Sequence, residues 1–71
     1  MAQISEGSKV KWDWGQGTAT GTVQEEFTES VTRTLKGSEV TRNGSEDTPA
    51  YLIAQDDGDE VLKLSTEVEA A

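Results

Sequence analysis

Hydrophobic and polar residues alternate along much of the chain, and this alternation predicts β-strands. Within Ser8–Trp14, the apolar side chains Val10, Trp12 and Trp14 share one parity, and charged side chains take the other. A period of two residues is typical of a strand with one buried face. We therefore expect a first strand here, with Trp12 in the core beside Val10.

A second strand is expected over Thr18–Phe27, after the glycine-bracketed loop 15–17. Its small residues Ala19, Gly21 and Val23 occupy alternate positions and so point to the same face. Side chains this small suit a tight interior. A single glycine inside a strand usually marks a bulge or a sharp bend, so we expect one near Gly21.

The next segment alternates again but is interrupted. Val31–Leu35 is followed by Lys36-Gly37, and the pattern resumes over Ser38–Arg42. Either one kinked strand or a tight hairpin fits this pattern. Asn43-Gly44 then indicates a turn, since both residues tolerate a positive φ angle.

The most apolar run, Tyr51–Gln55, follows Pro49 and predicts a central strand. Asp56–Asp59 contains the turn dipeptide Asp-Gly and predicts a hairpin, with Glu60–Leu64 as the returning strand. Ser65–Val68 is expected to form one short helical turn, capped by its first residue.

Five or so short strands joined by glycine turns predict an all-β fold, a small five-stranded SH3-like barrel with at most one short terminal helical turn. We expect a flexible lead-in over residues 1–7, the barrel over residues 8–68 and a tail over residues 69–71.

The charge and composition of the chain make several classes of function unexpected. The 71 residues include 14 acidic and six basic ones, a formal net charge of −8, and the cations are scattered along the chain. Nucleic-acid binding and anionic membrane surfaces are therefore not expected, because phosphates are bound by clustered Lys and Arg. No apolar run is long enough to span a bilayer, and no secretory signal is visible, so we expect a cytoplasmic protein.

The sequence contains few residues that are suited to catalysis or to metal binding. The chain has no histidine and no cysteine, so Ser and Thr nucleophiles lack a base and a zinc site lacks its usual ligands. The acidic turn at Asp56–Glu60 does not match the ligand spacing of a calcium loop, and a solvated turn is the expectation. We expect no enzyme, no cofactor and no metal site.

Four short motifs follow one another along the chain: Lys9–Trp12, Gly17–Val23, Leu35–Gly37 and Glu46–Ile53. In this order and spacing they resemble the hypervirulence-associated Tudor domain family, a group of small bacterial proteins of uncharacterised function. The resemblance covers about residues 7 to 68. It implies a Tudor-like, SH3-like barrel and brings no catalytic residues with it.

Tudor-like barrels often hold a methylated cation in an aromatic cage. The residues available for a cage are Trp14, Phe27 and Tyr51, with Asp13 or Asp47 as the anion. The alternative is that these aromatic side chains pack in the core, which is the more frequent role in a domain of this size.

A recognition surface is expected where a large aromatic residue lies beside accessible backbone. The loop at Trp14–Gly17 has this character, and Asp47 and Tyr51 flank Pro49 in a second, acidic loop. In an SH3-like barrel such loops often lie near one another, so Trp14, Asp47 and Tyr51 are predicted to border the partner-binding surface. The alternative is that Trp14 and Tyr51 close the ends of the barrel.

The sequence thus favours a non-enzymatic, monomeric binding module that recognises a protein or peptide, with a basic segment as one candidate partner. Two alternatives stay open: a structural protein that self-associates through a strand edge, and a nucleic-acid-associated Tudor-like domain.

Overall fold

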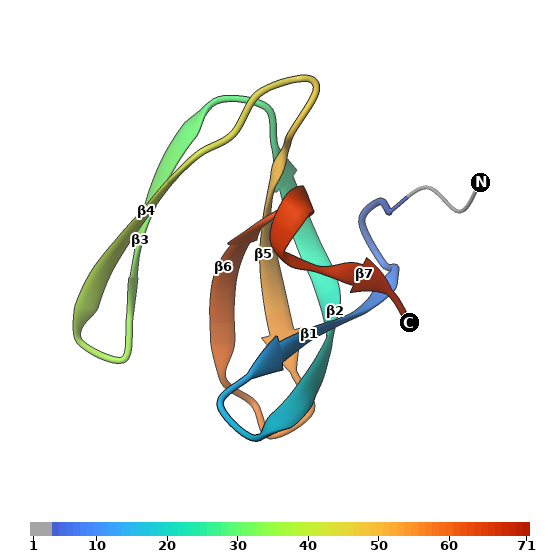
Figure 1. The fold of residues 1–71 in the computed structure, drawn as a ribbon. Helices are drawn as coiled ribbons and strands as arrows, with labels where there is room; N and C mark the ends of the chain where they lie inside the picture. The colour runs from blue at the N-terminus through green and yellow to red at the C-terminus, as the bar shows by residue number, and fades with distance from the viewer. Residues whose placement is uncertain (1–3) are drawn as a thin grey trace.

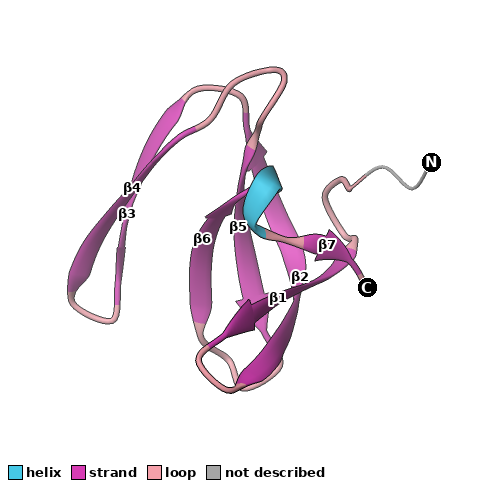
Figure 2. Cartoon of the chain, in the orientation of Figure 1, coloured by secondary structure: helices cyan, strands magenta, loops and turns pink. Residues whose placement is uncertain are grey.

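The computed structural model describes residues 4–71, except for the side chain of Trp14. It contains seven strands and one short 3-10 turn (Figures 1 and 2). The strands are β1 (Lys9–Trp14), β2 (Gly17–Phe27), β3 (Ser30–Leu35), β4 (Ser38–Asn43), β5 (Ala50–Gln55), β6 (Glu60–Leu64) and β7 (Glu69–Ala70), with η1 (Ser65–Glu67) between β6 and β7. The prediction of an all-β fold is confirmed.

The strands form two sheets, and each ladder is antiparallel. One sheet has the order β6-β5-β2-β1-β7, and the β3–β4 hairpin forms the other. A five-stranded barrel was predicted, in which the sheet would close on itself. The sheet is open instead, because no ladder of the described residues joins its outer strands, β6 and β7. Instead, the β3–β4 hairpin lies over one face of the sheet, where Figure 1 shows it beside β6.

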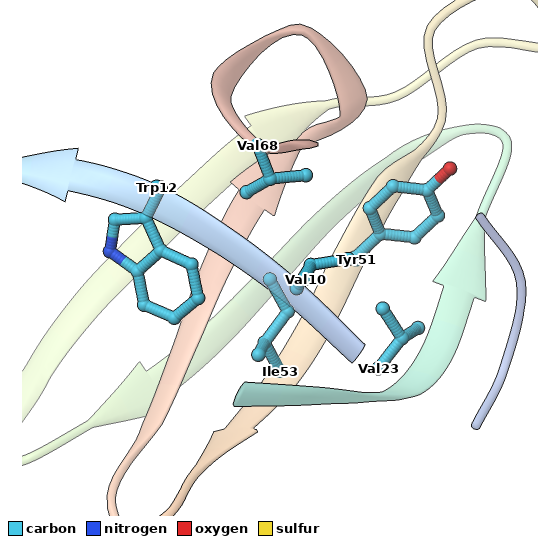
Figure 3. Packing of buried hydrophobic residues seen from close by; sticks show 6 residues of the cluster. All are labelled: Val10, Trp12, Val23, Tyr51, Ile53 and Val68. Atoms are coloured by element: carbon cyan, nitrogen blue, oxygen red, sulfur yellow. The ribbon is translucent and has the colours of Figure 1, made fainter. Parts of the chain in front are cut away.

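Strand β5 is the centre of the fold because both of its faces are buried. Tyr51 and Ile53 point into one hydrophobic cluster, and Ala50 and Leu52 point into another. This arrangement explains why β5 is the most continuously apolar run in the sequence. The first cluster, drawn in Figure 3, contains Val10, Trp12, Val23, Tyr51, Ile53 and Val68. The second contains Val31, Ala50, Leu52 and Leu62.

Trp12 is a core residue, as its parity predicted. Its side chain lies in the first cluster, and the residue is only 5% exposed. Val10, on the same face of β1, is fully buried. Burying a large aromatic side chain removes much apolar surface from water, so Trp12 is expected to carry a large part of the stability of this small core.

Residues 31–42 form a hairpin, which resolves the alternatives left open by the sequence. Lys36 and Gly37 make its two-residue turn, with φ angles of 53° and 78°. Two successive positive φ angles are typical of the type I′ turn, whose twist matches that of the flanking strands. On the outer face, the hydroxyl groups of Thr32 and Thr41 lie 2.9 Å apart.

The sequence predicted a bulge or a sharp bend near Gly21, and the bulge of β2 lies further along the strand. The ladder of β2 and β5 shifts register between Val23 and Glu25, so the extra residue is Gln24. Gly21 has a different role: a Cβ atom at this position would lie 2.6 Å from Ile53 Cγ2 and 2.7 Å from the Ala54 carbonyl oxygen. Glycine is required there because β5 approaches the backbone of β2 closely.

Both ends of the described chain contact the sheet. The Gly7 N–H donates to the Val23 carbonyl oxygen at 2.7 Å, and Ile4 packs against the first cluster. At the other end, β7 pairs with β1, although residues 69–71 were expected to form a tail.

The short turn η1 begins differently from the prediction. The residue that caps η1 is Leu64, without a side-chain hydrogen bond, so the predicted Ser65 cap is wrong.

No helix among residues 4–71 is long and apolar enough to cross a membrane.

Candidate functional site

The three predicted site residues do not lie together. The backbone of Trp14 pairs with Gly17 at the start of β2, whereas Tyr51 pairs with Glu26 near the end of β2. Asp47 is exposed in the loop between β4 and β5, and Tyr51 lies near the start of β5, next to this loop. The two loops that were expected to be neighbours therefore lie at opposite ends of the sheet (Figure 1).

Tyr51 is part of the core, at 3% exposure. Its hydroxyl oxygen lies 3.5 Å from the Ile4 carbonyl oxygen. Burial raises the pKa of the Tyr51 hydroxyl, and the nearby carboxylate of Glu26 raises it further. Tyr51 thus ties the N-terminal segment to β5. The side chain of Trp14 lies outside the described residues, and partner binding at Trp14 and Asp47 stays a prediction.

The aromatic side chains of the described residues do not gather into a cage. Tyr51 is buried, and the face of Phe27 is already covered by a cation. The Arg33 guanidinium carbon lies 4.9 Å from the centre of the Phe27 ring, and Arg33 also pairs with Glu25 at 3.5 Å. These contacts hold the β3–β4 hairpin against the end of β2.

A groove of about 300 Å³ lies where β1 passes the segment that contains η1 and β7. We call it the β1 groove. It is lined by Lys11, Trp12, Asp13, Thr18, Thr66, Glu67, Val68 and Glu69. Strand alternation places the apolar members, Trp12 and Val68, on the core side and leaves charged side chains at the rim.

The rim of the β1 groove is acidic. Asp13, Glu67 and Glu69 contribute three negative charges, and Lys11 contributes the one positive charge. The Thr18 hydroxyl donates to Asp13 Oδ1 at 3.3 Å and holds that carboxylate beside the groove. The groove therefore presents carboxylates around a small apolar floor, an arrangement that suits a cation attached to a polar chain.

A second groove, of about 250 Å³, separates the β3–β4 hairpin from β6. Leu35, Val40 and Leu62 supply its apolar part. An ion pair between Lys36 Nζ and Asp59 Oδ2, 2.7 Å apart, joins the hairpin tip to the β5–β6 turn. The hydrogen bond and charge of Asp59 raise the pKa of the Lys36 ammonium, which favours its charged form.

Most of the cations are already paired on the surface. Besides the Lys36 pair, the ion pairs are Lys9–Asp56 at 3.7 Å, Arg33–Glu25 at 3.5 Å and Arg42–Glu67 at 3.2 Å. Four of the six cations thus face a carboxylate, and ten of the 14 acidic residues belong to none of these pairs. The acidic excess is exposed, because no charged side chain among the described residues is buried.

Hydrogen bonds within the acidic turn, Asp56–Glu60, fix the conformation of its backbone. The Asp59 N–H donates to Asp57 Oδ1 at 3.0 Å, and the Gln55 N–H donates to the Asp59 carbonyl oxygen at 2.7 Å. Gly58 takes a positive φ angle of 94°, as a turn of this kind needs. Among residues 4–71, no group of three or more acidic side chains is placed to hold a metal ion.

Sequence reasoning missed the β1 groove. Its two walls come from residues about 50 positions apart, and they meet only because the two-residue strand β7 pairs with β1. A strand this short leaves no alternation that could be detected. The parity of Trp12 predicted its burial but carried no information about the segment beside it.

Comparison with known proteins agrees with this fold. A family model described as the Tudor domain of hypervirulence-associated proteins matches residues 7–68. Comparison with curated proteins found no match, and comparison with solved structures found none. The matched region contains β1 to β6, η1 and every residue of both hydrophobic clusters. The chain belongs to the family of hypervirulence-associated Tudor domains.

Proposed function

We propose that this protein is a non-enzymatic binding module that recognises a protein or peptide, with a basic segment as its partner. Tudor domains are generally binding modules, and the family match supports this class of function. We choose a basic partner because acidic side chains outnumber basic ones on the surface. Ten carboxylates remain outside the four ion pairs. Such a surface attracts cationic segments and repels nucleic acid.

The ionisable groups support binding rather than catalysis. The Lys36 ammonium and the Tyr51 hydroxyl have clearly displaced pKa values. One belongs to an exposed ion pair and the other to a core tyrosine, and they lie on different elements. Catalytic sites usually gather several perturbed groups in one cleft.

The loop residues Trp14 and Asp47 stay part of the proposal as candidate contact positions. Trp14 precedes the turn between β1 and β2, and Asp47 lies in the loop between β4 and β5. Figure 1 shows these two loops at opposite ends of the sheet, so each residue would belong to a separate contact. We also propose that the curled sheet corresponds to the Tudor-like, SH3-like barrel. The β3–β4 hairpin would then be an addition between β2 and β5. We further propose that the protein acts in the cytoplasm.

Self-association is the second candidate function, and one observation favours it. β6 is one of the two outer strands of the five-stranded sheet, so one of its edges has no ladder among the described residues. An open strand edge is a template for pairing with a second copy. Elution from a sizing column at several concentrations separates the two functions: a binding module stays monomeric, whereas a self-associating protein elutes earlier as its concentration rises.

The proposed function is tested with two synthetic peptides of equal length, one alternating Thr and Lys and the other alternating Thr and Glu. Tryptophan fluorescence follows the titration at low salt and at about 150 mM salt, where the Debye length falls to about 8 Å. We expect saturable binding of the lysine peptide, weakened by salt, and no binding of the glutamate peptide. Equal binding of both peptides, or binding of neither, would contradict the proposal.

A further inference from the structure

The edge of β1 is only partly covered by β7. The ladder between them contains two residue pairs, and beyond it the Ala71 N–H donates to the Lys9 carbonyl oxygen at 3.0 Å. In an antiparallel strand, the backbone groups of alternate residues point to the same edge. The N–H and C=O of Asp13 therefore point to the same edge as those of Lys9, beyond the ladder with β7, where no strand of the described residues pairs with them.

This uncovered part of the edge lies along the β1 groove. Asp13 lines the groove, and the opposite wall is the segment 66–69, which leaves the strand conformation in η1. The ladder with β7 stops at Lys11. A guest chain in extended conformation that enters the groove would continue the line of β7 and pair with the backbone of Asp13.

Trp12 is the residue of β1 that belongs both to the first cluster and to the lining of the β1 groove. It is 5% exposed, and its side chain carries one hydrogen-bond donor, the indole N–H. No described residue accepts a hydrogen bond from this N–H. Figure 3 shows the indole nitrogen at the side of the ring that faces away from Tyr51 and Val23. We therefore include this donor among the groups that a guest chain can contact.

We propose that the β1 groove binds an extended basic segment of a partner protein as an additional short strand beside Asp13. The segment pairs its backbone with the N–H and C=O of Asp13, and one of its carbonyl oxygens accepts from the Trp12 indole. Its Lys or Arg side chains meet the carboxylates of Asp13, Glu67 and Glu69 at the rim. This inference rests on the proposed function and adds to it the site and the mode of binding.

Charge complementarity selects the basic segment over an acidic one. The rim carries three carboxylates and one ammonium group, so its net charge is negative. Glu67 already pairs with Arg42, at 3.2 Å, and this leaves Asp13 and Glu69 as the main partners for an incoming cation. Lys11 lies opposite Glu69, where the ladder with β7 stops, and would favour an acceptor or a carboxylate at the guest residue nearest to it.

The test compares Asp13→Lys with Glu46→Lys, using the peptide that alternates Thr and Lys. Both substitutions make the same change of charge at an exposed position, but Glu46 lies in the β4–β5 loop, outside the β1 groove. We expect Asp13→Lys to weaken binding about tenfold, since it replaces an attraction by a repulsion. Glu46→Lys should change the affinity by less than about twofold, because distant charges are screened.

Two peptide analogues test the strand-like mode, each methylated on alternate backbone nitrogens in one of the two possible registers. One of them should bind much more weakly than the parent peptide, because it has lost the N–H that donates to Asp13. If Asp13→Lys fails to fold, Asp13→Asn takes its place, with a smaller loss expected.

The possible outcomes separate the two proposals. Unchanged affinity of the Asp13 variants, or full affinity of both methylated peptides, would overturn the assignment of the groove and leave the binding function standing. Failure of the parent peptide to bind the unaltered protein would overturn both.

Discussion

The carboxylate of Glu67 connects the β3–β4 hairpin to the segment that forms the wall of the β1 groove. Glu67 Oε1 accepts a hydrogen bond from Arg42 Nε at 3.2 Å and a second one from the Leu64 N–H at 2.8 Å. One oxygen atom thus joins β4, the end of β6 and η1. Both side chains of the Arg42–Glu67 pair are about one-third exposed, so solvent weakens the attraction without removing it.

Replacing Glu67 should therefore loosen this junction. We expect Glu67→Ala to lower the free energy of unfolding by about 1 kcal/mol, the range for a charge-assisted hydrogen bond discounted for partial exposure. Glu67→Gln is the matched control, because its amide oxygen can still accept from the Leu64 N–H, and it should lose less. Chemical denaturation measures both variants. Equal stability of Glu67→Ala and the unaltered protein would show that the junction contributes nothing.

Trp12 should be the most costly residue to truncate. We expect Trp12→Ala to remove about 3–5 kcal/mol, the usual range for a buried large aromatic residue. That amount is comparable with the whole stability of about 3–5 kcal/mol expected of a core this small. Lys11→Ala, at the exposed neighbouring position, should change stability by about 0.5 kcal/mol or less. A Trp12→Ala protein that melts within a few degrees of the unaltered one would contradict the assigned core.

Gly21 should not tolerate a methyl group, whereas Gly17 on the same strand should. A Cβ atom at position 21 meets Ile53 and Ala54 at contact distances too short to persist, and one at position 17 meets nothing within 4 Å. We expect Gly21→Ala to destabilise the fold by about 1–3 kcal/mol through overpacking. Gly17→Ala should have a much smaller effect. Thermal unfolding of both variants checks the prediction, and equal melting temperatures would refute the close approach of β2 and β5.

Stability should fall at alkaline pH as the Tyr51 hydroxyl ionises. Burial raises its folded-state pKa above the ordinary value of 10.0, so the unfolded chain loses its proton first. The contribution of Tyr51 is therefore complete below pH 10 and is lost as the pH rises through the folded-state pKa. Tyr51 is the only tyrosine, so ultraviolet absorbance reports its ionisation alone. A titration midpoint at or below the ordinary value in the folded protein would contradict the assigned burial.

Much of the fold could be predicted because it is encoded in local patterns. The alternation around Val10 and Trp12 indicated which face of β1 is buried, and Asp-Gly at position 57 indicated the hairpin that joins β5 to β6. The interrupted pattern at Lys36-Gly37 allowed two interpretations, because the positive φ angle of Lys36 is not favoured by its residue type.

The site could not be predicted in the same way because it depends on long-range contacts. Tyr51 has the residue type of a surface anchor, yet strand pairing places it under the N-terminal segment, next to Ile4. The β1 groove exists because β7 pairs with β1 for only two residues and then leaves Asp13 uncovered. No single stretch of sequence contains that relationship.

The most direct test of the account is an NMR titration of the isotope-labelled protein with the peptide that alternates Thr and Lys. Two tryptophan indole signals are present, and a Trp14→Phe variant assigns the one that belongs to Trp12. We predict that the Trp12 indole signal, the Asp13 amide signal and the amide signals of the segment 66–69 shift progressively and saturate together. Shifts confined to the β4–β5 loop or to β6, or no shifts at all, would contradict the account.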